Sequence, residues 1–85
     1  MTPQEVGQFL ERVLAYHARA YGYEVGERQR QIRRGSAELI AQGLRNGSLS
    51  MRQTARLAVE LFDLLYLHPD YAVPMLLDEL RDQVR

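Results

Sequence analysis

The sequence predicts an all-α fold: a compact, four-helix bundle-like single domain of 85 residues. Apolar residues recur at three- and four-residue steps, and two capping-box sequences open such stretches. Strand alternation and hairpin turns are not found. We expect helices at about residues 3–21, 26–45, 50–67 and 70–84.

The first helix begins at a capping box, in which Thr2 is the cap, Pro3 takes the first position and Glu5 supplies the carboxylate. One helical face then carries the apolar side chains up to the Gly22 region. Its members include Val6, Phe9, Leu10, Val13, His17, Ala20 and Tyr21. We interpret His17 as a residue at the edge of the core, and the nearby tyrosines as either core-edge or interface residues.

The second helix has Ile32, Leu39, Ile40 and Leu44 on one side. Glycine disfavours the helix interior, so Gly35 predicts either a continuous helix or one that is kinked or split there. Asn46-Gly47-Ser48 then forms a turn, because asparagine and glycine tolerate left-handed backbone conformations.

The third helix opens with a second capping box at Ser50 and Gln53. Its apolar side chains cover more than half of the helix circumference: Ala55, Leu57, Ala58, Val59, Leu61, Phe62, Leu64, Leu65 and Tyr66. A helix of this kind is central in its fold or contacts another chain. We expect this helix to be the core helix.

The third helix ends at His68-Pro69-Asp70, since proline disfavours helical geometry in the residue before it. The fourth helix begins at Asp70, which can cap it, or at Pro74. It presents leucines inward and Asp78, Glu79 and Asp82 outward.

Sequence motifs for catalysis are not found, and we predict that the protein is not an enzyme. Cysteine is absent, and His17 and His68 belong to no closely spaced ligand motif, so we expect no metal site. The glycines are scattered and lysine is lacking, which excludes a Walker motif. We therefore expect no cofactor.

The sequence also predicts a cytoplasmic location. The N-terminus lacks a basic region followed by an apolar stretch, and no apolar run approaches the roughly 20 residues that cross a bilayer. All eleven basic residues are arginine, which is typical of a GC-rich genome and indicates a bacterial or phage origin.

Charge is segregated along the chain, although the net charge is zero. Residues 28–56 carry seven arginines against Glu38, a net +6, whereas the flanking segments are acidic. The candidate partner-binding residues are Arg28, Arg30, Arg33 and Arg34. Like charges placed near one another on a helix repel unless an acidic group joins them.

Three candidates could supply the acidic group that neutralises these arginines. The first is internal, with the arginines paired by Asp63, Asp78, Glu79 or Asp82. The second is another protein with an acidic surface, which makes the chain a regulatory or inhibitory binding module that acts through its arginines and its apolar third helix. We also expect a homodimer.

The third source is DNA, the alternative function. Residues 39–58 loosely resemble a helix-turn-helix, and its candidate contact residues are Arg45, Arg52, Gln53 and Arg56. Against this, the turn is long and the chain lacks the net positive charge that supports phosphate binding, so nucleic acid is the less favoured partner.

Overall fold

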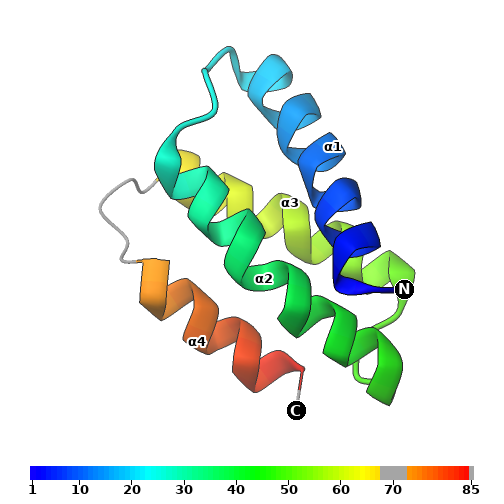
Figure 1. Ribbon diagram of the computed structural model, residues 1–85. Coiled ribbons are helices and arrows are strands. Elements are labelled where there is room, and N and C mark those ends of the chain that lie inside the picture. The colour runs from blue at the N-terminus through cyan, green and yellow to red at the C-terminus, as the bar shows by residue number, and fades with distance from the viewer. Residues whose placement is uncertain (68–72, 85) are drawn as a thin grey trace.

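The computed structural model describes residues 1–67 and 73–84, which form four helices and no strand (Figure 1). The helices are α1 (Pro3–Tyr21), α2 (Glu27–Asn46), α3 (Met51–Leu67) and α4 (Val73–Gln83). The predicted all-α fold is confirmed, and the first three helices match their predicted ranges to within one residue. The expected helix end at His68-Pro69 and the cap at Asp70 lie outside the described residues. No helix in the described ranges is long and apolar enough to cross a membrane.

Both predicted capping boxes are present at the starts of α1 and α3. The backbone N–H of Glu5 donates to Thr2 Oγ1 (3.2 Å), and that of Thr2 donates to Glu5 Oε1 (3.1 Å). At the start of α3, Gln53 N–H donates to Ser50 Oγ (3.1 Å) and Ser50 N–H donates to Gln53 Oε1 (2.8 Å). Each box satisfies two backbone donors that the first helical turn leaves free.

The two helix ends at Gly22 and Gly47 need glycine, because their φ angles of 73° and 81° lie in the left-handed region. The turn after α2 also holds the end of α4. The carbonyl of Val84 accepts hydrogen bonds from Asn46 Nδ2 (3.1 Å) and Ser48 Oγ (2.9 Å). Residues distant in sequence are thereby joined at one end of the molecule.

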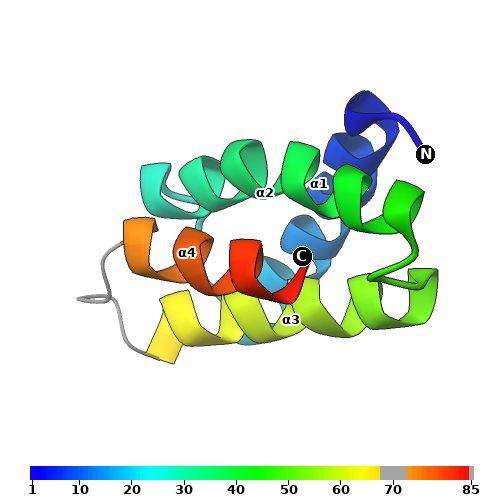
Figure 2. The same cartoon turned by 90° about the horizontal axis from the view of Figure 1, so that it is seen from below.

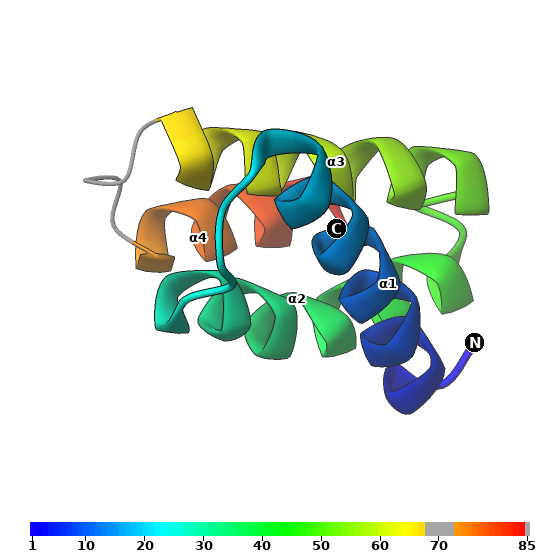
Figure 3. The same cartoon turned by 90° about the horizontal axis from the view of Figure 1, so that it is seen from above.

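Helices α2 and α3 run antiparallel, and α1 and α4 lie on opposite sides of this pair (Figures 2 and 3). Helix α2 contacts each of the other three helices. The core between them is apolar, and its largest fully buried members are Leu10, Ile32, Ile40, Phe62, Leu65, Leu76 and Leu80. Helix α3, which the sequence predicts to be the core helix, contributes more buried apolar side chains to this core than any other helix: Leu57, Ala58, Leu61, Phe62 and Leu65.

Helix α2 is continuous at Gly35, so of the two predicted alternatives the structure shows the unbroken helix. A Cβ atom at Gly35 would lie 2.9 Å from Leu77 Cδ1 of α4. At Gly43, a Cβ would lie 2.7 Å from Leu49 Cδ1 and 3.0 Å from Val84 Cγ1. These two glycines, eight residues apart, let α4 and the α2–α3 turn approach the backbone of α2.

Helix α3 buries only part of its apolar surface. Leu57, Ala58 and Leu61 are buried on the inner side, whereas Val59 and Tyr66 are exposed. Val59 and Tyr66 are seven residues apart and so lie on nearly the same side of the helix. The wide apolar stripe read from the sequence is therefore partly core and partly protein surface.

Candidate partner-binding groove

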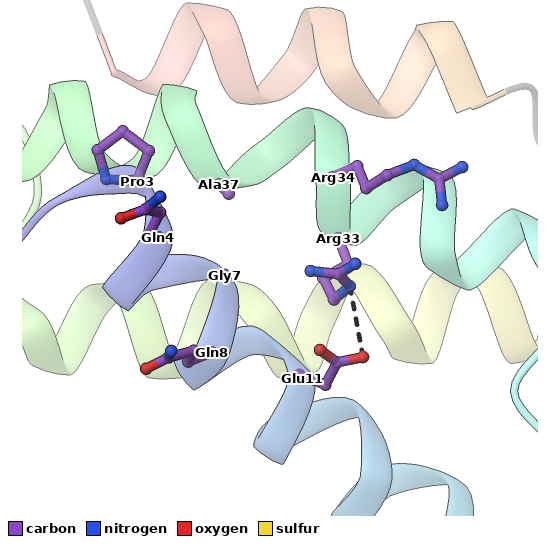
Figure 4. A pocket seen from close by; sticks show the side chains of 8 residues that line it. All are labelled: Pro3, Gln4, Gly7, Gln8, Glu11, Arg33, Arg34 and Ala37. Carbon is purple, nitrogen blue, oxygen red and sulfur yellow. Dashed lines mark ion pairs between the residues drawn. The ribbon is translucent and has the colours of Figure 1, made fainter.

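An open groove of about 640 Å³ lies between α1 and α2 (Figure 4). Gly7 and Ala37 line the groove where the two helices come close, since a Cβ atom at position 7 would lie 4.0 Å from the Cβ of Ala37. Polar side chains surround these small residues. The full lining is Pro3, Gln4, Gly7, Gln8 and Glu11 from α1, and Arg33, Arg34 and Ala37 from α2.

Arg33 is the incompletely satisfied cation of this groove. Its Nε atom is buried and has no hydrogen-bond acceptor among the described residues. The nearest carboxylate oxygen, Oε1 of Glu11, is 3.7 Å from Nε, which is an ion-pair distance but too long for a hydrogen bond. Figure 4 shows the two side chains pointing toward each other across the groove. A buried donor without an acceptor lowers the stability of the fold. An anion bound at Arg33 would supply the missing acceptor.

Arg34 also lines the groove, but its head group is engaged elsewhere. Its Nη2 donates to Glu27 Oε1 (2.7 Å), seven residues or about two helical turns back along α2. In Figure 4 its side chain extends away from Arg33 and Glu11. Both partners are exposed, so this ion pair contributes little to stability and can exchange with solvent or a ligand.

The four arginines predicted as a site do not share one face. Successive residues of an α-helix are about 100° apart, which places Arg30, Arg33 and Arg34 within about 100° of arc and Arg28 about 160° from Arg30. Arg28 and Arg30 are exposed and form no ion pair with any described residue. Arg30, Arg33 and Arg34 therefore lie on neighbouring parts of the α2 surface, on the side toward α1, whereas Arg28 lies on a different side of the helix.

Internal pairing by Asp63, Asp78, Glu79 or Asp82, one of the three open alternatives, is not found for these arginines among the ion pairs of the described residues. Their two ion pairs among the described residues go to Glu11 and Glu27 instead. Asp63 binds His17, and Asp78 accepts a hydrogen bond from Arg81 on its own helix (2.5 Å). The physical reason is orientation, because α4 turns its leucines toward α2 and exposes all three of its acidic residues.

A second polar group, which sequence reasoning missed, links α1 to α3. His17 is only 4% exposed. Its Nε2 is 2.6 Å from Asp63 Oδ1, and its Nδ1 is 2.7 Å from the hydroxyl of Tyr23. A carboxylate oxygen accepts, so Nε2 carries the hydrogen of the bond to Asp63, while Nδ1 shares the second hydrogen bond with the hydroxyl of Tyr23. The sequence signals for this network are His17 on the apolar side of the first helix and Asp63 within the apolar stretch of the third helix.

Aromatic rings surround this histidine. The ring centroids of Tyr21 and Tyr23 are 4.5 and 5.6 Å from that of His17, and Tyr66 stacks on Tyr23 at 5.1 Å. Burial raises the pKa of Tyr23, and the nearby charge of Asp63 adds to this rise. The charge of Asp63 is also the main cause of the raised pKa of Tyr21. Both phenols therefore stay protonated, which disfavours a tyrosinate nucleophile.

The residues predicted for DNA contact lie at the turn between α2 and α3. Arg45, Arg52 and Arg56 are exposed and form no ion pair with any residue in the described ranges. Gln53 is engaged in the α3 capping box. A helix-turn-helix holds its helices at about 90–120°, whereas α2 and α3 run antiparallel (Figures 2 and 3). The segment is a helical hairpin rather than a helix-turn-helix.

Comparisons with known proteins assign no family. Neither the family models nor the curated proteins nor the solved structures contain a match to this chain. Within residues 1–67 and 73–84, no group of three or more His, Asp and Glu side chains is placed to hold a metal ion. The groove at Arg33 is therefore the feature from which a function is inferred.

Proposed function

We propose that the protein is a small, non-enzymatic regulatory or inhibitory module that binds an acidic surface of another protein. The observation that carries this proposal is Arg33, which lines the open groove and whose buried Nε has no hydrogen-bond acceptor among the described residues. A guanidinium group matches a carboxylate in shape and charge, and such hydrogen bonds are among the strongest in proteins. An acidic side chain of a partner would supply the missing acceptor.

The exposed arginines near the groove support the same proposal. Arg28 and Arg30 lie in the first turns of α2 and form no ion pair with any described residue. Unneutralised charge of one sign speeds the encounter with a partner of opposite sign. Arg30 is on the groove side of α2 and would contact the partner, whereas Arg28 contributes through its longer-range field.

The outer side of α3 offers an apolar contact area in addition to the charged groove. Val59 and Tyr66 are 42% and 38% exposed, and Leu67 at the end of the helix is 62% exposed. We propose that this side is covered by the partner or, in a homodimer, by a second copy of the chain. We propose no catalytic role for His17, because it is buried and the raised pKa of Tyr23 keeps the adjoining phenol neutral.

Two double charge reversals of equal size test the proposal. The partner is first identified by affinity capture from the source cells with mass spectrometry, and its binding is then measured with purified proteins. Arg30→Glu with Arg33→Glu should abolish binding, while Arg52→Glu with Arg56→Glu should leave most of it. Circular dichroism should show unchanged helicity in both variants. Equal losses in the two variants would reject a role for the groove.

DNA binding remains the alternative, supported by Arg45, Arg52 and Arg56, which are exposed and form no ion pair within residues 1–67 and 73–84. It forecasts the reverse pattern, in which reversal of Arg52 and Arg56 removes binding to duplex DNA and reversal of Arg30 and Arg33 does not. That binding should also weaken steeply as salt is added. Absence of binding to any duplex at low salt would dispose of this alternative.

A further inference from the structure

We infer that the α1–α2 groove binds a short extended peptide segment through a carboxylate, and that Glu11 is a resident competitor which this carboxylate displaces from Arg33. The inference rests on the proposed function and names the ligand group that the groove would take. It also assigns Glu11 a role in setting how tightly acidic segments bind.

The size of the groove favours an extended segment. Its wall on α1 runs from Pro3 to Glu11, which at 1.5 Å per residue is about 12 Å, the length of about four extended residues. Its volume of about 640 Å³ lies within the range of small-ligand sites. A helix is about 10–12 Å across with its side chains and would lie over the groove rather than in it.

The lining of the groove matches the chemistry of such a segment. Gln4, Gln8 and Glu11 occupy successive turns of α1 and form one wall. Each glutamine side chain has an amide N–H₂ that donates and a carbonyl that accepts, which are the groups that an extended backbone requires. Arg33 on the opposite wall supplies a charged fork for one carboxylate.

Glu11 occupies this carboxylate position incompletely. Its side chain is 66% exposed, whereas that of Arg33 is 23% exposed, so the acid can swing into solvent while the arginine stays in place. The 3.7 Å separation neutralises charge but leaves Nε without a hydrogen bond. An incoming carboxylate that reaches about 2.8 Å from Nε would gain the hydrogen bond that Glu11 does not make.

Peptide titrations followed by ¹⁵N NMR test this inference. The probes are a five-residue peptide with one central glutamate, blocked at both ends, and the same peptide with glutamine. The glutamate peptide should shift the signals of Arg33 Nε–H and of the Gly7 and Gln8 amides. The glutamine peptide should bind at least several-fold more weakly, and equal binding of the two peptides would overturn the claim that a carboxylate is recognised.

Glu11→Gln tests the competition, with Glu38→Gln as its matched control. Glu38 is exposed on α2, forms no ion pair with any described residue and does not line the groove. Removing the competing carboxylate of the exposed Glu11 should tighten glutamate-peptide binding about two- to fivefold in Glu11→Gln. Equal affinity in the two variants would overturn the role of Glu11 and leave the proposed function standing. Absence of any groove shift with the glutamate peptide would overturn this inference, whereas the charge-reversal variants test the proposed function separately.

Discussion

His17 and Arg33 are both polar side chains held between helices, and they differ in how fully their hydrogen-bonding groups are satisfied. Both ring nitrogens of His17 have partners, Asp63 and Tyr23, at 2.6 and 2.7 Å. The Nε of Arg33 has none among the described residues. A satisfied buried group fixes the packing around it, whereas an unsatisfied one at a surface groove marks a place where a ligand can bind.

At the residue scale, His17→Phe should destabilise the protein by about 1–3 kcal/mol. Phenylalanine replaces the ring volume but leaves the hydroxyl of Tyr23 and Oδ1 of Asp63 without their partner. The free energy of unfolding is measured by urea denaturation. Asp63→Asn is the control, because it keeps an acceptor oxygen for the His17 N–H and should cost less. A His17→Phe variant as stable as the wild type would show that the network contributes nothing.

At the element scale, the packing of the four helices depends on how closely the other three approach the backbone of α2. Helix α2 contacts all three other helices, and two of its glycines lie where α4 and the α2–α3 turn pack tightly against it. Gly35 accommodates Leu77 of α4, and Gly43 accommodates Leu49 and Val84. Glycine is unfavourable in a helix interior, and here the close packing it permits offsets that cost.

Gly43→Ala and Gly7→Ala should change stability in opposite directions. A Cβ at position 43 would lie 2.7 Å from Leu49 and 3.0 Å from Val84, both of which are buried, so we expect a loss of about 1–3 kcal/mol. At position 7 the nearest side-chain atom is 3.6 Å away, an ordinary contact, and alanine should gain up to about 1 kcal/mol. Thermal or urea unfolding checks both. Stabilisation by Gly43→Ala would contradict the packing described at that end of α2.

At the scale of the whole molecule, zero net charge conceals a basic middle and acidic ends. The fold does not cancel this separation, since Arg28, Arg30, Arg45, Arg52 and Arg56 form no ion pair with any described residue. Exposed apolar side chains on α3 add a second feature that a partner or another copy can cover. Both features favour a protein that works by association.

The proposed homodimer through α3 makes a prediction about mass. Light scattering should give twice the 9.8 kDa chain mass at high concentration, and Val59→Glu should return the protein to the monomer because it places a charge in the apolar contact. Ala15→Glu, an equivalent change on the exposed side of α1, should leave the dimer intact. A monomer mass at every concentration would reject the homodimer and leave the groove proposal unaffected.

The sequence by itself determined the helices and several of their ends, because these depend on neighbours within a few residues. The capping boxes at Thr2 and Ser50 and the glycine-ended helices before residues 22 and 47 are local patterns, and the structure contains each of them. Periodicity also predicted much of the inward side of each helix, although Ala20 and Tyr21 on the predicted apolar side of α1 are exposed. These features need no knowledge of how the helices pack.

Only the tertiary structure decided which side chains meet across helices. His17 and Asp63 are 46 positions apart, and Glu11 and Arg33 come from different helices, so no local spacing predicts either pair. The sequence shows that the middle of the chain is basic, but it does not show which acidic residues pair with the arginines. Helix composition sets which face is apolar, whereas the order of packing depends on the orientation of every helix and on the small residues that let two helices approach.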